Sequence, residues 1–302
     1  MMPQIAFIGL GHMGYPMANN LLKAGYPVTG YDIVPATLEA FVKEGGIAGK
    51  DMASTVQNAD IVITMLPEGK HVKSAYEGPQ GILSHARPNT LIAECSTIDI
   101  ETSRLIHGEA EKKGIRLIDA PVSGGVAAAK GGTISFMIGG QKEDLESLRP
   151  YLETMGKTII YCGAAGLGQA AKICNNLVLG ISMIGVCEAF NLAEKLGLDT
   201  RTFYDVASQS SAQCWSITQY CPVPGPVPSS PANRKFEAGF TAAMMLKDLK
   251  LAVHAAQETS APLPLGAEAM AIYTLFCGNG GQSTDFSGII EFLKGSKKEK
   301  TC

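Results

Sequence analysis

The sequence predicts an α/β fold in two parts, a doubly wound parallel sheet followed by an all-α C-terminal domain. Three observations carry this prediction. The first half of the chain alternates short apolar runs with amphipathic stretches, a glycine-rich turn directly follows the first apolar run, and strand-like runs disappear after residue 163. At 302 residues, with 46% apolar and 18% charged residues, the chain is long enough for two packed domains.

Seven apolar or β-branched runs are the expected strands of the first domain, and most of the spaces between them have the pattern of amphipathic helices. Because these runs are apolar throughout and separated by helices, they are typical of a parallel sheet covered on both faces, the Rossmann pattern. The expected strands lie at 4–9, 27–32, 60–66, 90–95, 115–120, 133–140 and 157–162. The clearest expected helices lie at 12–24, 35–44, 99–113 and 141–154.

A glycine-rich joint, GAAGLGQ at 163–169, separates the two expected domains. We therefore predict a dinucleotide-binding domain over 1–164 and a helical substrate and oligomerisation domain over 165–302. The second domain begins with one long apolar helix over 169–196, and Gly197 directly after it is suited to a C-terminal cap.

Two irregular segments follow in the second domain. The segment 222–231 contains five prolines, so it can form neither a helix nor a central strand. The polar tail at 295–302 is expected to be disordered.

Composition restricts the class of partner. A formal net charge of −3 provides no basic field for nucleic acid or an anionic membrane, and the longest apolar run, 177–187, is shorter than the ~18 residues typical of a membrane span. The eight cysteines and five histidines lack the spacing of a metal site, and the cysteines are interpreted as reduced, mostly buried thiols. We expect a cytoplasmic homo-oligomer that acts on a small molecule, with no nucleic-acid partner, membrane partner or metal.

The turn after the first strand has the spacing G-x-G-x-x-G, opens a helix, and is followed by a second strand that ends in Asp32. In this context the glycines permit a tight turn and let backbone amides approach a pyrophosphate at the helix N-terminus. Asp32 would bind the ribose hydroxyls and repel the 2′-phosphate of NADP, which favours NAD. The alternative is a structural glycine turn beside a solvated aspartate, and His12 is interpreted as a spacer. The expected cofactor turn comprises Gly9, Leu10, Gly11, His12, Met13 and Gly14.

Four motifs occur in the order found in β-hydroxyacid dehydrogenases, and the chain resembles this family over essentially its whole length. They are FIGLGHMGYPMANNLL (7–22), DAPVSGG (119–125), KICNN (172–176) and KDL (247–249). The proline-rich loop is similar to that of members that act on 3-hydroxyisobutyrate. The resemblance implies NAD-dependent oxidation of 3-hydroxyisobutyrate to methylmalonate semialdehyde, a step of valine degradation. Another small β-hydroxy acid such as L-serine, or a non-catalytic dinucleotide-binding scaffold, remains as an alternative.

The resemblance also implies that Lys172 is the catalytic acid/base. Oxidation of an alcohol requires removal of the hydroxyl proton, and desolvation lets a lysine serve near the working pH. Asn176 lies four residues on, hence on the same helical face, where it is expected to orient Lys172 or the substrate. The alternatives are a lysine that extends to solvent and an asparagine satisfied at an interdomain contact.

Substrate-binding residues are expected at two places. The turn of Ser123, Gly124 and Gly125 offers a hydroxyl and approachable amides for the substrate carboxylate, although it could be only a flexible turn. Trp215 and Tyr220 beside the proline-rich loop are expected to close an apolar pocket around the methyl-bearing carbon, with a core role as the alternative.

Further cofactor contacts are expected at the ends of two strands and on a C-terminal helix. Leu66, Pro67 and Thr97 follow strands whose carboxyl ends open the ligand crevice of such sheets, with core or capping roles as the alternative. By resemblance Lys247 reaches the nicotinamide with Asp248 beside it, whereas periodicity alone makes both residues ordinary helix charges.

Overall fold

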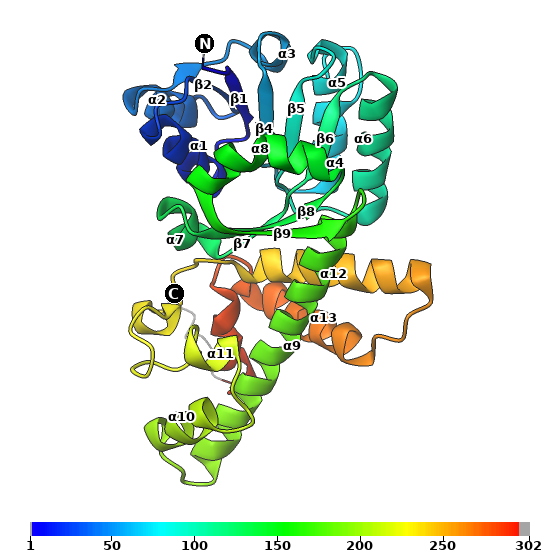
Figure 1. The fold of residues 1–302 in the computed structure, drawn as a ribbon. Helices are drawn as coiled ribbons and strands as arrows, with labels where there is room; N and C mark the ends of the chain where they lie inside the picture. The colour runs from blue at the N-terminus through cyan, green and yellow to red at the C-terminus, as the bar shows by residue number, and fades with distance from the viewer. Residues whose placement is uncertain (1, 296–302) are drawn as a thin grey trace. The chain divides into compact units, whose positions relative to one another are not determined.

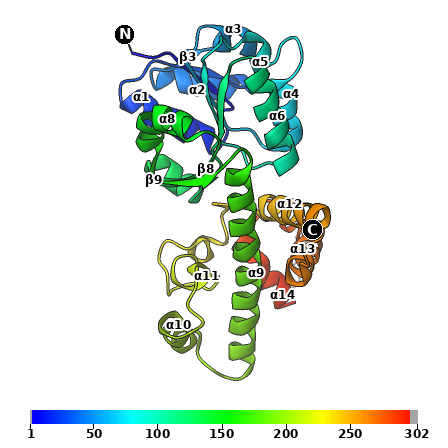
Figure 2. The ribbon, with the colours of Figure 1, turned by 45° about the vertical axis from the view of Figure 1, so that its right-hand side comes forward.

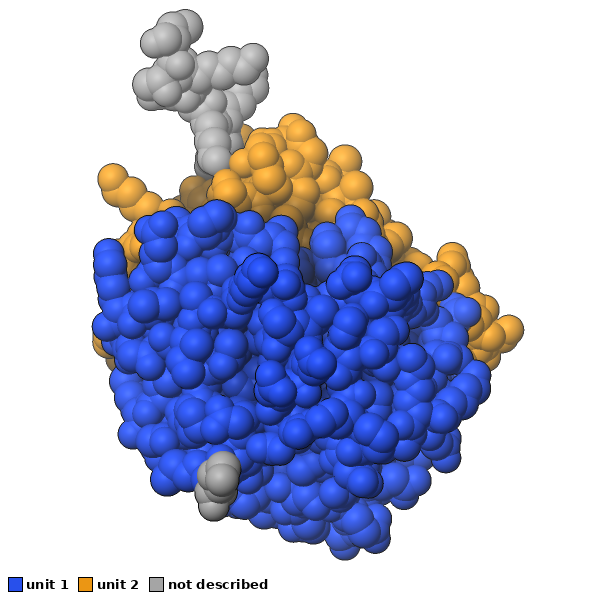
Figure 3. Space-filling view, turned by 90° about the horizontal axis from the view of Figure 1, so that it is seen from above, with its two compact units in different colours: residues 1–172 blue, residues 173–302 orange. Residues whose placement is uncertain are grey.

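The computed structural model describes residues 2–295, which divide after Lys172 into two compact units (Figure 3). The division falls inside helix α9 (Leu167–Lys195), a little beyond the boundary expected at 164/165. The glycine-rich joint lies where strand β9 (Gly156–Gly163) ends and α9 begins.

The N-terminal unit is built on one sheet with helices against it, and all seven expected strands are present (Figure 1). Two further strands of two residues each, β3 and β7, were not expected. The strands are β1 (Ile5–Ile8), β2 (Val28–Tyr31), β3 (Ile47–Ala48), β4 (Ile61–Thr64), β5 (Leu91–Glu94), β6 (Arg116–Asp119), β7 (Val122–Ser123), β8 (Ile134–Gly139) and β9. Their order is β3-β2-β1-β4-β5-β6-β8-β7, with β9 beside β8. This doubly wound order confirms the predicted Rossmann class.

The expectation of a wholly parallel sheet is wrong at one place. Strand β8 runs antiparallel to β6 and β7, whereas its pairing with β9 is parallel. Only residues 124–133 connect β7 to β8. A parallel return needs a crossover of about a dozen residues or more, so the shorter connection reverses the strand.

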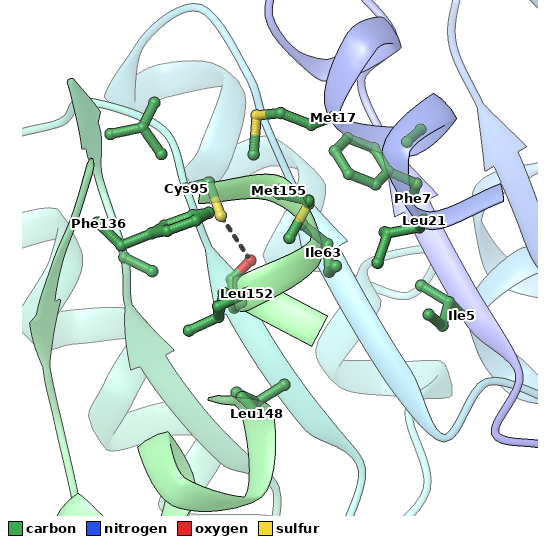
Figure 4. Packing of buried hydrophobic residues seen from close by; sticks show 14 of the residues in the cluster. Ile5, Phe7, Met17, Leu21, Ile63, Cys95, Phe136, Leu148, Leu152 and Met155 are labelled. Atoms are coloured by element: carbon green, nitrogen blue, oxygen red, sulfur yellow. Dashed lines mark hydrogen bonds between the residues drawn. The ribbon is translucent and has the colours of Figure 1, made fainter. Parts of the chain in front are cut away.

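Both faces of the sheet are buried at the inner strands, as the continuous apolar runs predicted, but β9 at the edge is largely exposed, with Ile160 50% and Tyr161 43% exposed. In β1, Ile5 and Phe7 enter one apolar cluster, whereas the alternating residues Ala6 and Ile8 enter the other. The first cluster includes Leu152 and other side chains of α1 and α8 (Figure 4). The helices of this unit are α1 (Gly14–Lys23), α2 (Pro35–Lys43), α3 (Met52–Gln57), α4 (Gly69–Tyr76), α5 (Ile82–His85), α6 (Ile100–Lys112), α7 (Gly125–Lys130) and α8 (Lys142–Met155).

The described part of the C-terminal unit contains helices and no strands, which confirms the predicted all-α domain. Figure 2 follows α9 as one uninterrupted helix. At Gly180 an added Cβ would lie 3.0 Å from Leu249 and 3.1 Å from Met245, so α9 and α12 pack closely at this position. After α9 come α10 (Thr200–Gln209), α11 (Trp215–Thr218), η1 (Pro231–Arg234), α12 (Ala242–Thr259), α13 (Pro264–Phe276), η2 (Cys277–Gly281), η3 (Phe286–Gly288) and α14 (Ile289–Leu293).

Helix α9 is capped where the sequence predicted. Gly197 has a φ of +79°, and the N–H groups of Gly197 and Leu198 donate to the carbonyls of Glu194 and Ala193. This is the glycine-dependent end expected after an apolar helix.

By length and composition alone, α9 is apolar enough to cross a membrane, with a mean hydropathy of 1.6 in its most apolar window. The apolar run at 177–187 is shorter than a membrane span, but the whole 29-residue helix is long and apolar enough to form one. Core helices of proteins outside membranes meet it too. Met183 and Cys187 on α9 are completely buried in the apolar cluster of the C-terminal unit.

Of the proline-rich segment at 222–231, residues 222–230 lie outside helices and strands, as expected, whereas Pro231 begins the short helix η1. The segment is held in place by hydrogen bonds. Ser230 Oγ donates to the carbonyl of Cys221 at 2.6 Å, and Asn233 Nδ2 donates to the carbonyl of Val227 at 2.8 Å. The expected disordered tail, apart from Gly295, lies outside the described residues.

The seven cysteines among the described residues are free, but the expectation that most are buried is wrong. Cys95, Cys187 and Cys221 are buried, three others are half-buried, and Cys174 is exposed on α9. The 29 residues of α9 are apolar around much of their circumference, so apolar neighbours in the sequence do not indicate which face is covered.

Candidate active site

The glycine turn between β1 and α1 has a shape that requires glycine at two positions. Gly9 has a φ of +92°, and an added Cβ would collide with the carbonyl oxygen of Met65. An added Cβ at Gly14 would collide with the carbonyl oxygen of Gly9, because α1 begins directly against the turn. At Gly11 nothing lies within 4 Å of an added Cβ, so the backbone there is open to close approach.

The three intervening residues of the turn differ in exposure. Leu10 is buried, Met13 is half-buried and His12 is exposed. An exposed His12 at the turn is consistent with its interpretation as a spacer.

Asp32 joins the glycine turn to the turn after β2. Its Oδ2 accepts from the backbone N–H of Leu10 at 2.7 Å, and its Oδ1 accepts from that of Val34 at 2.8 Å. Ile33 is 86% exposed, and no cationic residue directly follows Asp32. A carboxylate beside an open glycine turn suits a ribose that carries no 2′-phosphate, so these residues fit NAD.

The ends of β4 and β5 lie at one edge of the sheet, because these neighbouring strands are parallel. The backbone N–H of Leu66 donates to Ser96 Oγ at 2.8 Å. Pro67 is exposed and Thr97 is half-buried. The structure therefore brings the ends that carry Leu66 and Thr97 together, as the parallel sheet predicted.

Two buried carboxyl groups at the same edge were missed by sequence reasoning. Glu94 ends β5 and Asp119 ends β6, and both are completely buried. Burial raises the pKa of Glu94 to about 8, although its hydrogen bond from the N–H of Ser96 acts in the opposite direction. Asp119 accepts from His107 Nε2 at 3.1 Å and from the N–H groups that start α9. The sequence did contain a signal for them, because each is a carboxyl residue near the end of an expected apolar strand.

The turn of residues 123–125 follows β7. Ser123 is half-buried, Gly124 has a φ of +128° and Gly125 a φ of +71°. An added Cβ at Gly124 would lie 2.7 Å from the Cβ of Ala128. The backbone of this turn therefore needs glycine, which a merely flexible turn would not require.

Helix α9 carries the two predicted catalytic residues on one face. Lys172 is 7% exposed and Asn176 is 1% exposed. Asn176 Nδ2 donates to Asp248 Oδ2, and Lys247 Nζ lies 3.2 Å from Asp248 Oδ1. The carboxylate of Asp248 therefore connects two other predicted site residues, Asn176 and Lys247. Neither Lys247 nor Asp248 is the fully solvated helix charge that periodicity alone suggested, since their side chains are 25% and 3% exposed.

Trp215 and Tyr220 stack, with ring centroids 4.7 Å apart and planes at 19°. Trp215 is 46% exposed, and Tyr220 also stacks on Phe286. The hydroxyl of Tyr220 donates to Asp285 Oδ2 at 2.9 Å, which is a partner that the sequence gave no reason to expect. The stack has one accessible end, at Trp215.

No group of three or more potential metal ligands occurs among residues 2–295. One hollow of about 520 Å³ lies on the C-terminal unit between the end of α12 and the start of α13. None of the predicted site residues lines it.

Comparison with known proteins agrees with this geometry. Residues 4–163 match the family model of the NAD-binding domain of 6-phosphogluconate dehydrogenase, and residues 166–293 match the NAD-binding model of NADP-dependent 3-hydroxyisobutyrate dehydrogenase. The chain is 46% identical over 293 residues to the probable 3-hydroxyisobutyrate dehydrogenase of Mycobacterium tuberculosis, covering 97% of this chain and 98% of that one. The chain belongs to the β-hydroxyacid dehydrogenase family.

Other members of the family are similar over nearly the same length. An NAD-dependent L-serine dehydrogenase of Pseudomonas aeruginosa is 45% identical, covering 95% of this chain and 96% of that one. The mitochondrial 3-hydroxyisobutyrate dehydrogenase of Bos taurus is 43% identical, covering 96% and 86% respectively. A solved structure of the Mycobacterium tuberculosis 3-hydroxyisobutyrate dehydrogenase with L-serine superposes with a TM-score of 0.92 at 46% identity, covering 97% and 100%.

Family membership confirms the predicted class, an NAD-dependent β-hydroxyacid dehydrogenase with a Rossmann domain. It leaves the choice among small hydroxy acids open, because relatives named for two different substrates are almost equally similar.

Proposed function

We propose that this chain oxidises the alcohol of 3-hydroxyisobutyrate to methylmalonate semialdehyde, a step of valine degradation. The observation that carries the proposal is a buried lysine on α9, one helical turn before a buried asparagine, in a chain that also has the glycine turn and Asp32 of an NAD site. Sequence identity of 43–46% to relatives named 3-hydroxyisobutyrate dehydrogenase supports 3-hydroxyisobutyrate as the substrate.

Lys172 is the proposed acid/base. It would remove the hydroxyl proton of the substrate during oxidation and return it during reduction. Its 7% exposure on an apolar helix supports this role over a lysine that extends into solvent. Asn176 would hold the substrate or Lys172 in position, and its hydrogen bond to Asp248 fixes the side chain for that task.

The substrate carboxylate would be held by Ser123, Gly124 and Gly125, through the hydroxyl and the backbone amides. The positive φ angles of both glycines support a turn shaped for close approach. Trp215 and Tyr220 would contact the methyl-bearing carbon, and the exposed end of their stack supports this assignment.

Bound NAD would supply the hydride acceptor. The proposed binding set is Gly9, Leu10, Gly11, His12, Met13, Gly14, Asp32, Leu66, Pro67, Thr97, Lys247 and Asp248. Open backbone at Gly11 and the carboxylate of Asp32 support binding at the adenosine and pyrophosphate end. No metal has a role in this proposal.

L-serine is the second candidate substrate. A relative named for L-serine is 45% identical, and the matching solved structure was obtained with L-serine. The two acids differ by a methyl or an ammonium group on one carbon, a difference of a few kcal/mol in transition-state binding. We expect kcat/KM with NAD to be higher for 3-hydroxyisobutyrate. A tenfold preference for L-serine would overturn the substrate assignment, and turnover of neither acid with NAD still bound would favour a non-catalytic scaffold.

The assembly is proposed to be a cytoplasmic homo-oligomer that has no nucleic-acid or membrane partner. Large apolar side chains on the C-terminal unit support self-association, among them Val178, Leu192 and Leu275, which are 58–63% exposed. Light scattering of the purified chain should give a mass above the 31.8 kDa of one copy. A monomeric mass at micromolar concentration would contradict it.

A further inference from the structure

Gln169 is a completely buried amide in the first turn of α9 and was not among the predicted site residues. Its Oε1 accepts from the backbone N–H of Ile98 at 3.1 Å, and its Nε2 donates to the backbone carbonyl of Ser96 at 2.8 Å. A second, longer contact runs from Nε2 to Glu94 Oε2 at 3.4 Å. One side chain therefore uses both of its polar ends on the segment that follows β5.

The two backbone groups that Gln169 binds flank Thr97, which is a proposed cofactor contact. Ser96 in turn accepts from the backbone N–H of Leu66 through its hydroxyl at 2.8 Å. The ends of β4 and β5 are thus tied to each other through Ser96 and to α9 through Gln169.

The backbone of Gln169 is hydrogen-bonded as well as its side chain. Asp119 accepts from the N–H of Gly166 at 2.8 Å and from the N–H of Gln169 at 2.9 Å, and so caps the start of α9 from the end of β6. An added Cβ at Gly168 would collide with the carbonyl oxygen of Met137, which keeps the helix start against β8. Lys172 lies three residues beyond Gln169, less than one helical turn away.

We propose that Gln169 is a positioning residue of the dehydrogenase reaction, which sets the segment of Ser96, Thr97 and Ile98 relative to Lys172. The inference rests on the proposed roles of Thr97 at the cofactor and of Lys172 at the substrate hydroxyl. Every contact that carries it lies within the N-terminal unit.

The chemistry requires this alignment. The carbinol hydrogen leaves as a hydride toward the nicotinamide while the hydroxyl proton goes to the base, so the cofactor and the base must be aligned on the same substrate. A displacement of the reacting groups by about 1 Å lowers the rate on the order of a hundredfold. A buried amide is suited to the task, because it donates at one end, accepts at the other and adds no charge beside Glu94 and Asp119.

Two variants of the full chain test the proposal. Gln169→Met keeps the length and volume of the side chain but removes the donor and the acceptor, whereas Gln169→Glu keeps an acceptor for Ile98. Thr55→Val is the control, because it removes a side-chain hydrogen bond of another buried residue of the N-terminal unit, from Thr55 Oγ1 to the carbonyl of Asp51 at 2.6 Å. Each variant is assayed with the better of 3-hydroxyisobutyrate and L-serine, and melting temperature and NADH binding report its folding.

We expect Gln169→Met to lower kcat by about 10–100-fold, with changes below threefold in KM and in the Kd of NADH. Gln169→Glu should lose at least as much, because it removes the donor to the Ser96 carbonyl and places a second carboxyl beside Glu94. The deuterium isotope effect on kcat, measured with carbinol-deuterated substrate, should rise in Gln169→Met because hydride transfer becomes rate-limiting. A purely structural role would not produce this change.

Three results would overturn the proposal: kcat of the folded variants within twofold of wild type, an equal loss of kcat in Thr55→Val, or a loss confined to NADH binding. If the wild type turns over one of the acids and Gln169→Met does so at the same kcat, this inference alone is overturned. Turnover of neither acid by the wild type would overturn the proposed function as well.

Discussion

Asn176 and Asp248 are joined by a hydrogen bond from the side-chain amide to the carboxylate, although they lie 72 positions apart on α9 and α12. An ionised carboxylate only accepts hydrogen bonds, so the NH₂ group of Asn176 must face Asp248. The carbonyl oxygen of the same amide accepts from Asn175 Nδ2 at 2.9 Å. Asp248 therefore determines which way the amide of Asn176 is oriented.

Replacement of Asp248 tests this orientation. Asp248→Ala leaves the buried amide of Asn176 without its acceptor, and we expect kcat/KM for the hydroxy acid to fall by roughly 10–100-fold. Asp248→Asn keeps an acceptor for Asn176 but removes the charge beside Lys247, so its loss should be smaller. Steady-state kinetics decide, with Glu258→Ala on the exposed face of α12 as the control. Equal losses in Asp248→Ala and Glu258→Ala would contradict the orienting role.

Replacement of Lys172 tests the proposed acid/base. Lys172→Ala should lower kcat by about 10²–10⁴-fold, because no other group is proposed to take the hydroxyl proton. NADH binding should change little, since the proposed anchors at Gly9 and Asp32 are unaltered. Lys195→Ala, in the exposed last turn of the same helix, is the control and should retain wild-type kcat. Turnover of Lys172→Ala within tenfold of wild type would exclude this mechanism.

The sequence predicted most of the fold because its elements have strong local patterns. The apolar runs of β1 and β4 and the glycine turn at Gly9 depend only on neighbouring residues, and so does the face shared by Lys172 and Asn176. The reversal of β8 could not be predicted in the same way, because it depends on the short α7 connection rather than on the strand itself.

The buried polar contacts were missed for a related reason. Glu94 and Asp119 become neighbours only because β5 and β6 pair in register. Gln169 reaches Ser96 only once α9 is packed against the strand ends. Likewise, periodicity placed Asp248 on a helix but did not indicate which helix would pack against it. The contact with Asn176 could therefore not be predicted from the sequence.

Replacement of Asp32 tests cofactor selection. Asp32→Asn retains one oxygen that can accept from the backbone N–H of Leu10 or Val34, but it removes the negative charge that would repel a 2′-phosphate. We expect the ratio of kcat/KM for NAD to that for NADP to fall at least tenfold. Asp60→Asn, which alters another aspartate of the N-terminal unit, should leave the ratio unchanged. An unaltered ratio in Asp32→Asn would place discrimination elsewhere.

The pH dependence of stability tests the buried Glu94, whose pKa is raised by burial from 4.5 to about 8. Below pH 4.5 the carboxyl is protonated in both the folded and unfolded states. Between pH 4.5 and 8 it ionises only in the unfolded state, so rising pH favours unfolding, and above pH 8 the penalty is constant. We therefore expect Glu94→Gln to gain free energy of unfolding relative to wild type from pH 5 to 8, by up to a few kcal/mol. Urea denaturation at pH 5–9 measures this difference.

Asp51→Asn is the contrasting control, because the hydrogen bond from Ser54 lowers the pKa of Asp51. The difference in free energy of unfolding between Asp51→Asn and wild type should therefore stay constant over this range. A constant difference for Glu94→Gln as well would show that Glu94 is ionised in the folded protein throughout.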